Sequence, residues 1–178
     1  MEFQNLIEKR RSVRKYAEGN TVTKDEILSM IKAAQEAPSW KNSQTGRYYC
    51  IMDGKNVEQF RRECLPEMNA GKCENAVLII STFVHDRAGF QKDGTADNEL
   101  GNGWGCYDLG LQNENLILKA EELGYGTLIM GIRDADKIRE FCSVPETETV
   151  VGVIAVGVPG EEPGRPKRKD TEEIVKFL

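Results

Sequence analysis

Two apolar segments constrain the fold of this chain more than any other feature. Residues 75–84 read NAVLIISTFV and residues 149–159 read TVVGVIAVGVP, and neither segment contains a charged side chain. A nearly continuous apolar run of this length is typical of a strand that is buried on both faces. The segments RYYCIMDG at 47–54 and GTLIMGI at 126–132 predict two further strands, so we expect four strands in the chain.

Helix signals alternate with these strands. Residues 23–26 form a capping box, in which Thr23 and Glu26 satisfy each other's backbone amides at the start of a helix. A long helix is expected between Asp108, a candidate N-cap, and Gly124, a typical residue just after a helix end. Shorter helices are predicted at 3–10, 55–64 and 134–142. Because helices and strands interleave, we expect one α/β or α+β domain over residues 1–178.

Composition narrows the functional classes. The 24 Lys and Arg residues against 29 Asp and Glu residues give a formal net charge of −5, which argues against general nucleic-acid binding. The five cysteines are odd in number and lack CxxC spacing, so reduced thiols in a cytoplasmic protein are expected, with no metal site. Neither a signal peptide nor an apolar run near the ~20 residues of a membrane span is present, so no membrane partner is expected.

Positive charge is nevertheless concentrated in two short segments. KRRSVRKYA at 9–17 and RPKRK at 165–169 lie at opposite ends of the chain. Arginine binds phosphate through planar, bidentate contacts, and Ser12 can add a hydroxyl group. Two interpretations remain open from the residues alone: solvated surface charge, or one phosphate that is held from two sides.

Two further segments could contact a flat ligand. In APSWKNSQTGRYY at 37–49, carboxamides could bind the edge of a heterocycle and Trp40 could stack on a ring, although a plain loop is the alternative. GYGTLIMGI at 124–132 is not a GxGxxG motif and precedes a strand, so it supports a Rossmann dinucleotide site poorly. Gly131 could allow close approach to a flat ligand or could simply end the strand.

The common catalytic sets are missing from the sequence. His85 is the only histidine, and neither a GxSxG nor a GxxxxGK[ST] motif is present. A histidine-based triad or a multi-histidine metal site is therefore not expected. If the chain is an enzyme, we expect a bound cofactor to carry the reactive chemistry, with no catalytic side chain.

Four segments in order resemble the nitroreductase superfamily of FMN-dependent oxidoreductases, in particular its smaller members. These segments are RRSVRKY, APSWKNSQTGRYY, ELGYGTLIMG and RPKRK, and they span nearly the whole chain. The resemblance implies an α+β fold with a central, mainly antiparallel sheet flanked by helices. It also implies an interlocked homodimer with two FMN molecules at the subunit interface.

The resemblance further implies which residues hold FMN. The first basic segment would bind the phosphate and ribityl chain, the second would close on the same phosphate, and the loop after the second helix would reach the partner chain's flavin. Asn69 would bind the pyrimidine edge, and residues 130–131 would lie near flavin N5. The implied cofactor ligands are Arg10, Arg11, Ser12, Arg14, Pro38, Ser39, Trp40, Asn42, Gln44, Asn69, Met130, Gly131, Arg165, Lys167, Arg168 and Lys169. Which of the last four contacts the phosphate is left open.

The implied activity is ping-pong reduction of nitroaromatic or quinone-type acceptors by NADH or NADPH through FMN. Met130 stands where several larger members carry an acidic residue, and residues 86–105 replace the variable region that shapes the substrate channel. Trp104 and Tyr107 are the candidates for lining that channel. Two alternatives remain: a specialised reaction such as flavin fragmentation or reductive dehalogenation, and a flavin store or sensor without turnover. The sequence selects neither the nucleotide nor the physiological acceptor.

Overall fold

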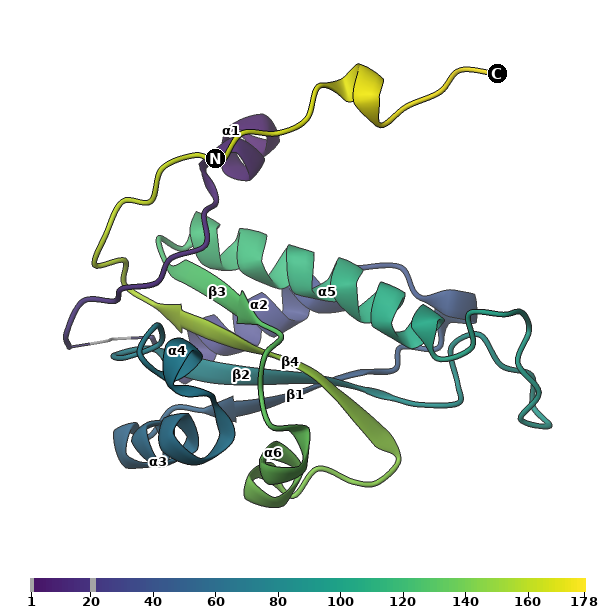
Figure 1. Cartoon of the computed structure of the whole chain (residues 1–178), viewed down its shortest axis with the longest axis horizontal. Helices are drawn as coiled ribbons and strands as arrows, with labels where there is room; N and C mark the ends of the chain where they lie inside the picture. The colour runs from purple at the N-terminus through teal and green to yellow at the C-terminus, as the bar shows by residue number, and fades with distance from the viewer. Residues whose placement is uncertain (1, 20–21) are drawn as a thin grey trace.

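The computed structural model describes residues 2–19 and 22–178 (Figure 1). Its sheet has four strands in the order β1-β2-β4-β3, and every neighbouring pair is antiparallel. The strands are β1 Gly46–Ile51, β2 Val77–Val84, β3 Gly126–Met130 and β4 Glu148–Gly157. All four strands coincide with the segments that the sequence predicts, and the antiparallel order makes the class α+β.

The two apolar segments become the centre of the sheet. β2 pairs with β4 so that Ile79 faces Ile154 and Ile80 faces Val153, and all four residues have no exposed surface. Because alternate residues of a strand point to opposite faces, the strand needs a covering layer on each side. Ile80 and Val153 belong to one core cluster, whereas Ile79 and Ile154 belong to the other.

Helices provide these two layers (Figure 1). α2 (Lys24–Gln35) and α5 (Gly103–Glu122) cover one face, with Met30 and Leu116 fully buried there. α3 (Gly54–Cys64) and α6 (Ala135–Cys142) cover the other face through Phe60 and Ile138. α4 (Glu67–Ala70) is a single turn between α3 and β2 that the sequence did not predict.

The helix ends test the predicted caps. The Thr23–Glu26 capping box is present at the start of α2, and Gly124 follows α5 with a φ of 88°. The N-cap prediction for Asp108 is wrong, because α5 begins at Gly103 after Asn102. Asp108 lies inside the helix, where its carboxylate accepts the backbone N–H of Trp40 at 2.8 Å instead of capping its own helix.

The chain ends lie on one side of the molecule (Figure 1). α1 (Phe3–Lys9) leads into the first basic segment, and the C-terminal segment with its short turn η2 (Thr171–Glu173) projects from the body. Across the described residues, no helix combines the length and the apolar character needed to cross a membrane.

Candidate functional site

The first basic segment lies along the outer edge of β3. The amide of Val13 donates to the carbonyl of Thr127 over 2.9 Å, and Ser12 forms a parallel bridge with the same residue. Gly126 makes this approach possible, since a Cβ atom there would lie 2.6 Å from the Val13 side chain. The sheet edge therefore fixes the backbone of this segment, and Arg14 within it is exposed.

The chain returns to the same edge after β4. The amide of Ala17 donates to the carbonyl of Val158 at 2.9 Å, which aligns the segment after β4 with the first basic segment. Arg165 then pairs with Glu8 of α1 at 3.8 Å. The two basic segments thus meet at one end of the molecule, as a shared anion site requires.

The other cations of the second basic segment extend into solvent. Lys167, Arg168 and Lys169 are exposed, and Arg168 donates only to the carbonyl of Pro166, at 3.4 Å, among the described contacts. The structure brings Arg165 alone against the N-terminal helix. The contact of any of these four residues with a phosphate stays a prediction.

The first basic segment carries guanidinium groups without an ion-pair partner among the described residues, although the Glu161 carboxylate accepts the backbone amide of Arg14 at 2.8 Å. Arg11 and Arg14 donate through their guanidinium groups to nearby backbone carbonyls at 2.5–3.0 Å. Within residues 2–19 and 22–178, no carboxylate forms an ion pair with Arg10, Arg11 or Arg14, whereas Lys9 pairs with Glu121 at 3.3 Å. Unpaired positive charge that is fixed against a sheet edge favours an anionic ligand.

Asn69 and Gly131 lie close together near the end of β3. Asn69 is 6% exposed on α4, and its Nδ2 donates to the carbonyl of Ile132 at 2.8 Å. Met130 is buried, whereas Gly131 is exposed, and a Cβ atom at position 131 would meet no atom within 4 Å. The backbone at Gly131 is therefore open to a flat ligand, with the Asn69 carboxamide nearby.

The loop 38–44 lies at the opposite end of α5. The amide of Trp40 donates to Asp108, and the Trp40 ring lies 4.5 Å from the Trp104 ring, both near the start of that helix. The first basic segment instead adjoins the end of α5, where Lys9 pairs with Glu121. The structure therefore does not bring this loop to the first basic segment of the same chain.

The loop itself is held in a costly conformation. Within it, Pro38 and Asn42 are exposed, and the Ser39 hydroxyl accepts the amide of Gln44 at 3.0 Å. Positive φ angles occur at three non-glycine residues: Lys41 (47°), Asn42 (54°) and Gln44 (46°). Three of the four buried side-chain polar atoms without a hydrogen-bond partner among the described residues lie in or next to this loop, namely Trp40 Nε1, Ser43 Oγ and Thr45 Oγ1; the fourth is Arg133 Nε. Strained backbone and unsatisfied polar atoms concentrate at functional sites.

A family model for the nitroreductase family matches residues 7–158. The chain belongs to the nitroreductase family. An NADPH-dependent oxidoreductase from Staphylococcus aureus is 26% identical over 164 residues, which cover 89% of this chain and 65% of that protein. The chain therefore spans slightly less than two thirds of the length of this curated relative.

Solved structures of nitroreductase-like proteins share the fold. A nitroreductase family protein from Streptococcus pneumoniae has a TM-score of 0.85 at 19% identity, covering 99% of this chain and 100% of that chain. A BluB-like flavoprotein from Clostridium difficile has a TM-score of 0.79 at 28% identity, covering 100% of this chain and 99% of that chain. A structure described as an oxidoreductase containing FMN has a TM-score of 0.75 at 25% identity, covering 90% of this chain and 79% of that chain. Together with the family match, these likenesses show that the chain has the fold of nitroreductase-family proteins.

Two features of this nitroreductase-family chain were not predicted from its sequence. Asp108 is 3% exposed and orients Trp40, and burial raises the pKa of its carboxyl group, although the N–H of Trp40 partly offsets this. Lys72, one turn beyond Asn69, is half-buried, and the described residues provide it with no ion pair. Lys72 follows Asn69 by three residues, and its backbone amide donates to the Asn69 carbonyl at 3.0 Å.

The predicted channel residues lie beside the loop 38–44. Trp104 packs between Trp40 and Tyr107, with ring centroids 4.5 and 5.7 Å away, and Tyr107 is 60% exposed. Desolvation by burial raises the pKa of Cys106. A raised pKa leaves the thiol protonated near neutral pH, so this cysteine is not an activated nucleophile.

Proposed function

We propose that this chain is an FMN-dependent oxidoreductase that uses NADPH or NADH to reduce nitroaromatic or quinone-type acceptors. The observation that carries the proposal is the convergence of three features at one edge of the sheet. These are the unpaired cations of residues 10–14, the buried carboxamide of Asn69 and the open backbone at Gly131. The names of the FMN-containing and NADPH-dependent relatives support the same assignment.

The residues present suit the parts of FMN. Arg10, Arg11 and Arg14 would bind the phosphate, because charged guanidinium groups form strong hydrogen bonds to phosphate oxygens. Ser12 would add a hydroxyl donor, and the Gly131 backbone would lie against the ring system. Bound FMN would supply the redox chemistry, accepting hydride at N5 from the nicotinamide and passing it to the acceptor.

Asn69 would act at the pyrimidine edge of the ring. With Nδ2 donating to Ile132, the Asn69 Oδ1 can still accept an N–H group from the ligand. Protons would come from water, since the site residues include no histidine.

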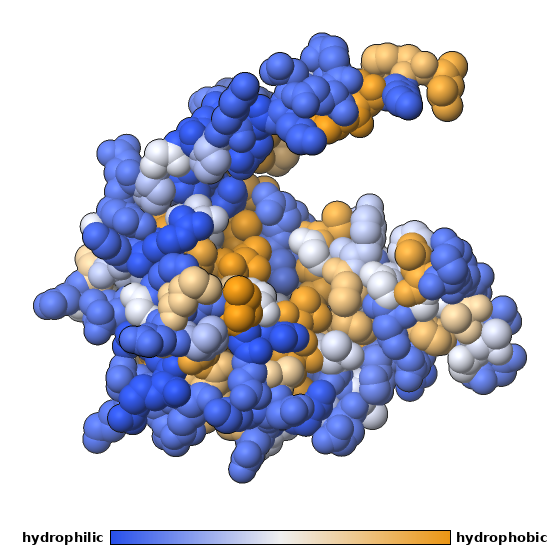
Figure 2. Space-filling view, viewed as in Figure 1, coloured by the Kyte–Doolittle hydropathy of each residue, from blue (hydrophilic) through white to orange (hydrophobic). Residues whose placement is uncertain are grey.

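The functional unit is proposed to be a homodimer. A second chain would bring its own loop 38–44 to the bound FMN, because the loop of the same chain does not approach residues 10–14. The C-terminal segment supports this, since its Ile174 and Phe177 are 73% and 94% exposed. Figure 2 shows apolar surface on this projecting arm. Apolar side chains that project from the body in this way are typical of an interaction surface.

One assay tests the function. The purified protein is titrated with FMN, reduced anaerobically with NADPH or NADH, and then mixed with a nitroaromatic acceptor. Loss and recovery of the flavin absorbance would support the proposal. A bound flavin that neither nucleotide reduces would leave a store or sensor as the better assignment, and a protein that never binds FMN would refute the cofactor assignment.

A further inference from the structure

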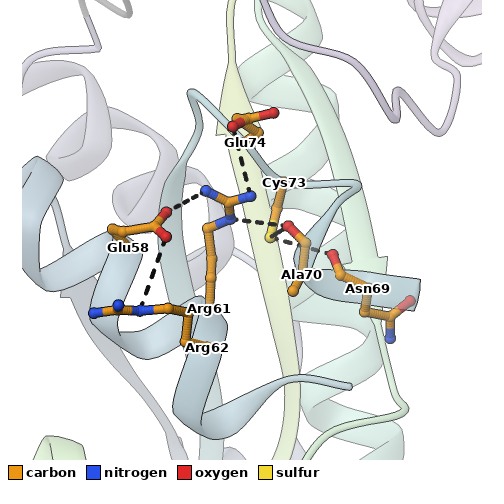
Figure 3. Close-up of polar contacts among 7 residues, drawn as sticks. All are labelled: Glu58, Arg61, Arg62, Asn69, Ala70, Cys73 and Glu74. Atoms are coloured by element: carbon orange, nitrogen blue, oxygen red, sulfur yellow. Dashed lines mark hydrogen bonds and ion pairs between the residues drawn. The ribbon is translucent and has the colours of Figure 1, made fainter. Parts of the chain in front are cut away.

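Arg61 lies outside the FMN site described above but contacts the turn that carries Asn69 (Figure 3). Its side chain, on α3, is only 13% exposed. Its Nε donates to the carbonyl of Ala70 at 2.8 Å, and its two terminal nitrogens pair with Glu58 and, at 3.9 Å, with Glu74. One guanidinium group therefore joins α3, the last residue of α4 and the loop after it.

α4 depends on such external contacts. It has only four residues, and an isolated helix of one turn is unstable because nucleation is costly. The last carbonyls of any helix also lack partners within the helix. Here the Cys73 thiol donates to the carbonyls of Asn69 and Ala70 at 3.4 and 3.5 Å, and Arg61 supplies the second donor to Ala70.

The helix α4 then holds the Asn69 side chain against the end of β3. Asn69 Nδ2 donates to the carbonyl of Ile132 at 2.8 Å, next to the open backbone of Gly131. A shift of α4 would therefore move the carboxamide relative to Gly131. Arginine suits this role better than lysine, since its planar fork can bond one carbonyl and two carboxylates in different directions.

We infer that Arg61 is a positioning residue for the flavin site, which acts through Ala70 and α4 to hold the Asn69 carboxamide in place. The inference rests on the proposed FMN function. Arg61 does not contact the ligand itself, so its loss would change the affinity and the reduction potential of bound FMN only to the extent that Asn69 is displaced.

The neighbouring residue provides a matched control. Arg62 has the same side chain and lies 3.9 Å from the same Glu58 carboxylate, but it is 69% exposed and points away from α4 (Figure 3). Arg62→Met removes an equal charge without touching the turn. A comparison of Arg61→Met with Arg62→Met therefore separates positioning from a change in net charge.

The experiment measures the FMN dissociation constant and the midpoint potential of bound FMN, with the thermal stability of the FMN-free protein beside them. Arg61→Met is expected to weaken FMN binding about tenfold and to shift the potential, and Arg62→Met to change affinity by less than about twofold. Because both changes act on the same contact, adding Arg61→Met to the Asn69→Ala protein should raise the FMN dissociation constant by less than about a further twofold.

The outcomes separate this inference from the proposed function. If the unaltered protein binds no FMN, the proposed function fails and this inference fails with it. If the unaltered protein binds FMN but Arg61→Met lowers only thermal stability, or adds its full effect in the Asn69→Ala background, then Arg61 is merely structural. Should Arg61→Met not fold, Arg61→Lys keeps the charge, and an unchanged FMN affinity and potential in that variant would overturn the inference.

Discussion

The length of α5 separates the two parts of the proposed FMN site, and this separation predicts how two defective chains behave when mixed. Asp108 holds the loop 38–44 at one end of the helix, and Glu121 adjoins the first basic segment at the other. The 13 residues from Asp108 to Glu121 rise ~20 Å at 1.5 Å per residue. The loop of one chain is therefore far from a phosphate held at residues 10–14 of the same chain.

The perturbation uses two variants that share no position. Arg10→Ala with Arg11→Ala removes the phosphate cations, and Asn42→Gly with Gln44→Gly removes two carboxamides while keeping backbone angles that glycine tolerates. Loss of a hydrogen bond to a charged group costs about 1.5–3 kcal/mol, so the arginine variant should bind FMN at least about tenfold more weakly; loss of two neutral bonds at about 0.5–1.5 kcal/mol each should weaken binding to the carboxamide variant about fivefold or more. The two chains carry different affinity tags and are co-expressed, and the doubly tagged dimer is purified.

In a shared site, each FMN contacts the first basic segment of one chain and the loop of the other. The mixed dimer then contains one site with neither defect and one site with both. A titration monitored by flavin fluorescence should show one FMN per dimer at the affinity of the unaltered protein. If both sites instead bind weakly and equally, each site is built within one chain, and a protein that stays monomeric would refute the shared site directly.

Three further predictions follow from single positions. Arg10→Ala should weaken FMN binding by about 1.5–3 kcal/mol, while Lys15→Ala, which removes an exposed cation, should leave it unchanged in the same titration. Gly131→Val should abolish FMN binding but leave the unfolding temperature intact, because its Cβ meets no atom of the chain within 4 Å. Burial raises the pKa of the Asp108 carboxyl group in the folded protein. The contribution of this group to the free energy of unfolding is therefore complete below the unfolded-state pKa and is lost as pH rises through the folded-state pKa. Asp108→Asn should therefore gain stability relative to the unaltered chain between pH 4 and 7 in urea unfolding, and parallel pH profiles would contradict this.

The sequence predicts the fold well where local patterns decide the structure. The strands at 77–84 and 148–157 follow from apolar runs, and the start of α2 follows from a capping box between residues three apart. The start of α5 could not be predicted in this way. Asp108 has the chemistry of an N-cap, but its partner is the amide of Trp40, 68 positions earlier in the chain.

The candidate site shows the same division between local and distant information. The sequence identifies the two basic segments, and the structure adds that Arg165 and Glu8 bring their ends together. The sequence also predicts the loop 38–44 and Trp104 as separate candidates, whereas in the structure the Trp40 ring of that loop lies 4.5 Å from the Trp104 ring. Motifs thus indicate which residues contact a ligand, but the segments that share one ligand are determined by the lengths and packing of the elements between them.

Arg61 and Arg62 show how the sequence distinguishes a buried arginine from an exposed one. Both lie in the segment FRREC, where composition does not distinguish them. Helical spacing does, because Val57, Phe60 and Cys64 are the buried residues of α3, and Arg61 is four positions after the first and three before the last. An arginine within the apolar stripe of a helix must bond buried acceptors, since leaving its donors unpaired is costly. The same reasoning makes Arg61, and not Arg62, the residue to test for control of Asn69.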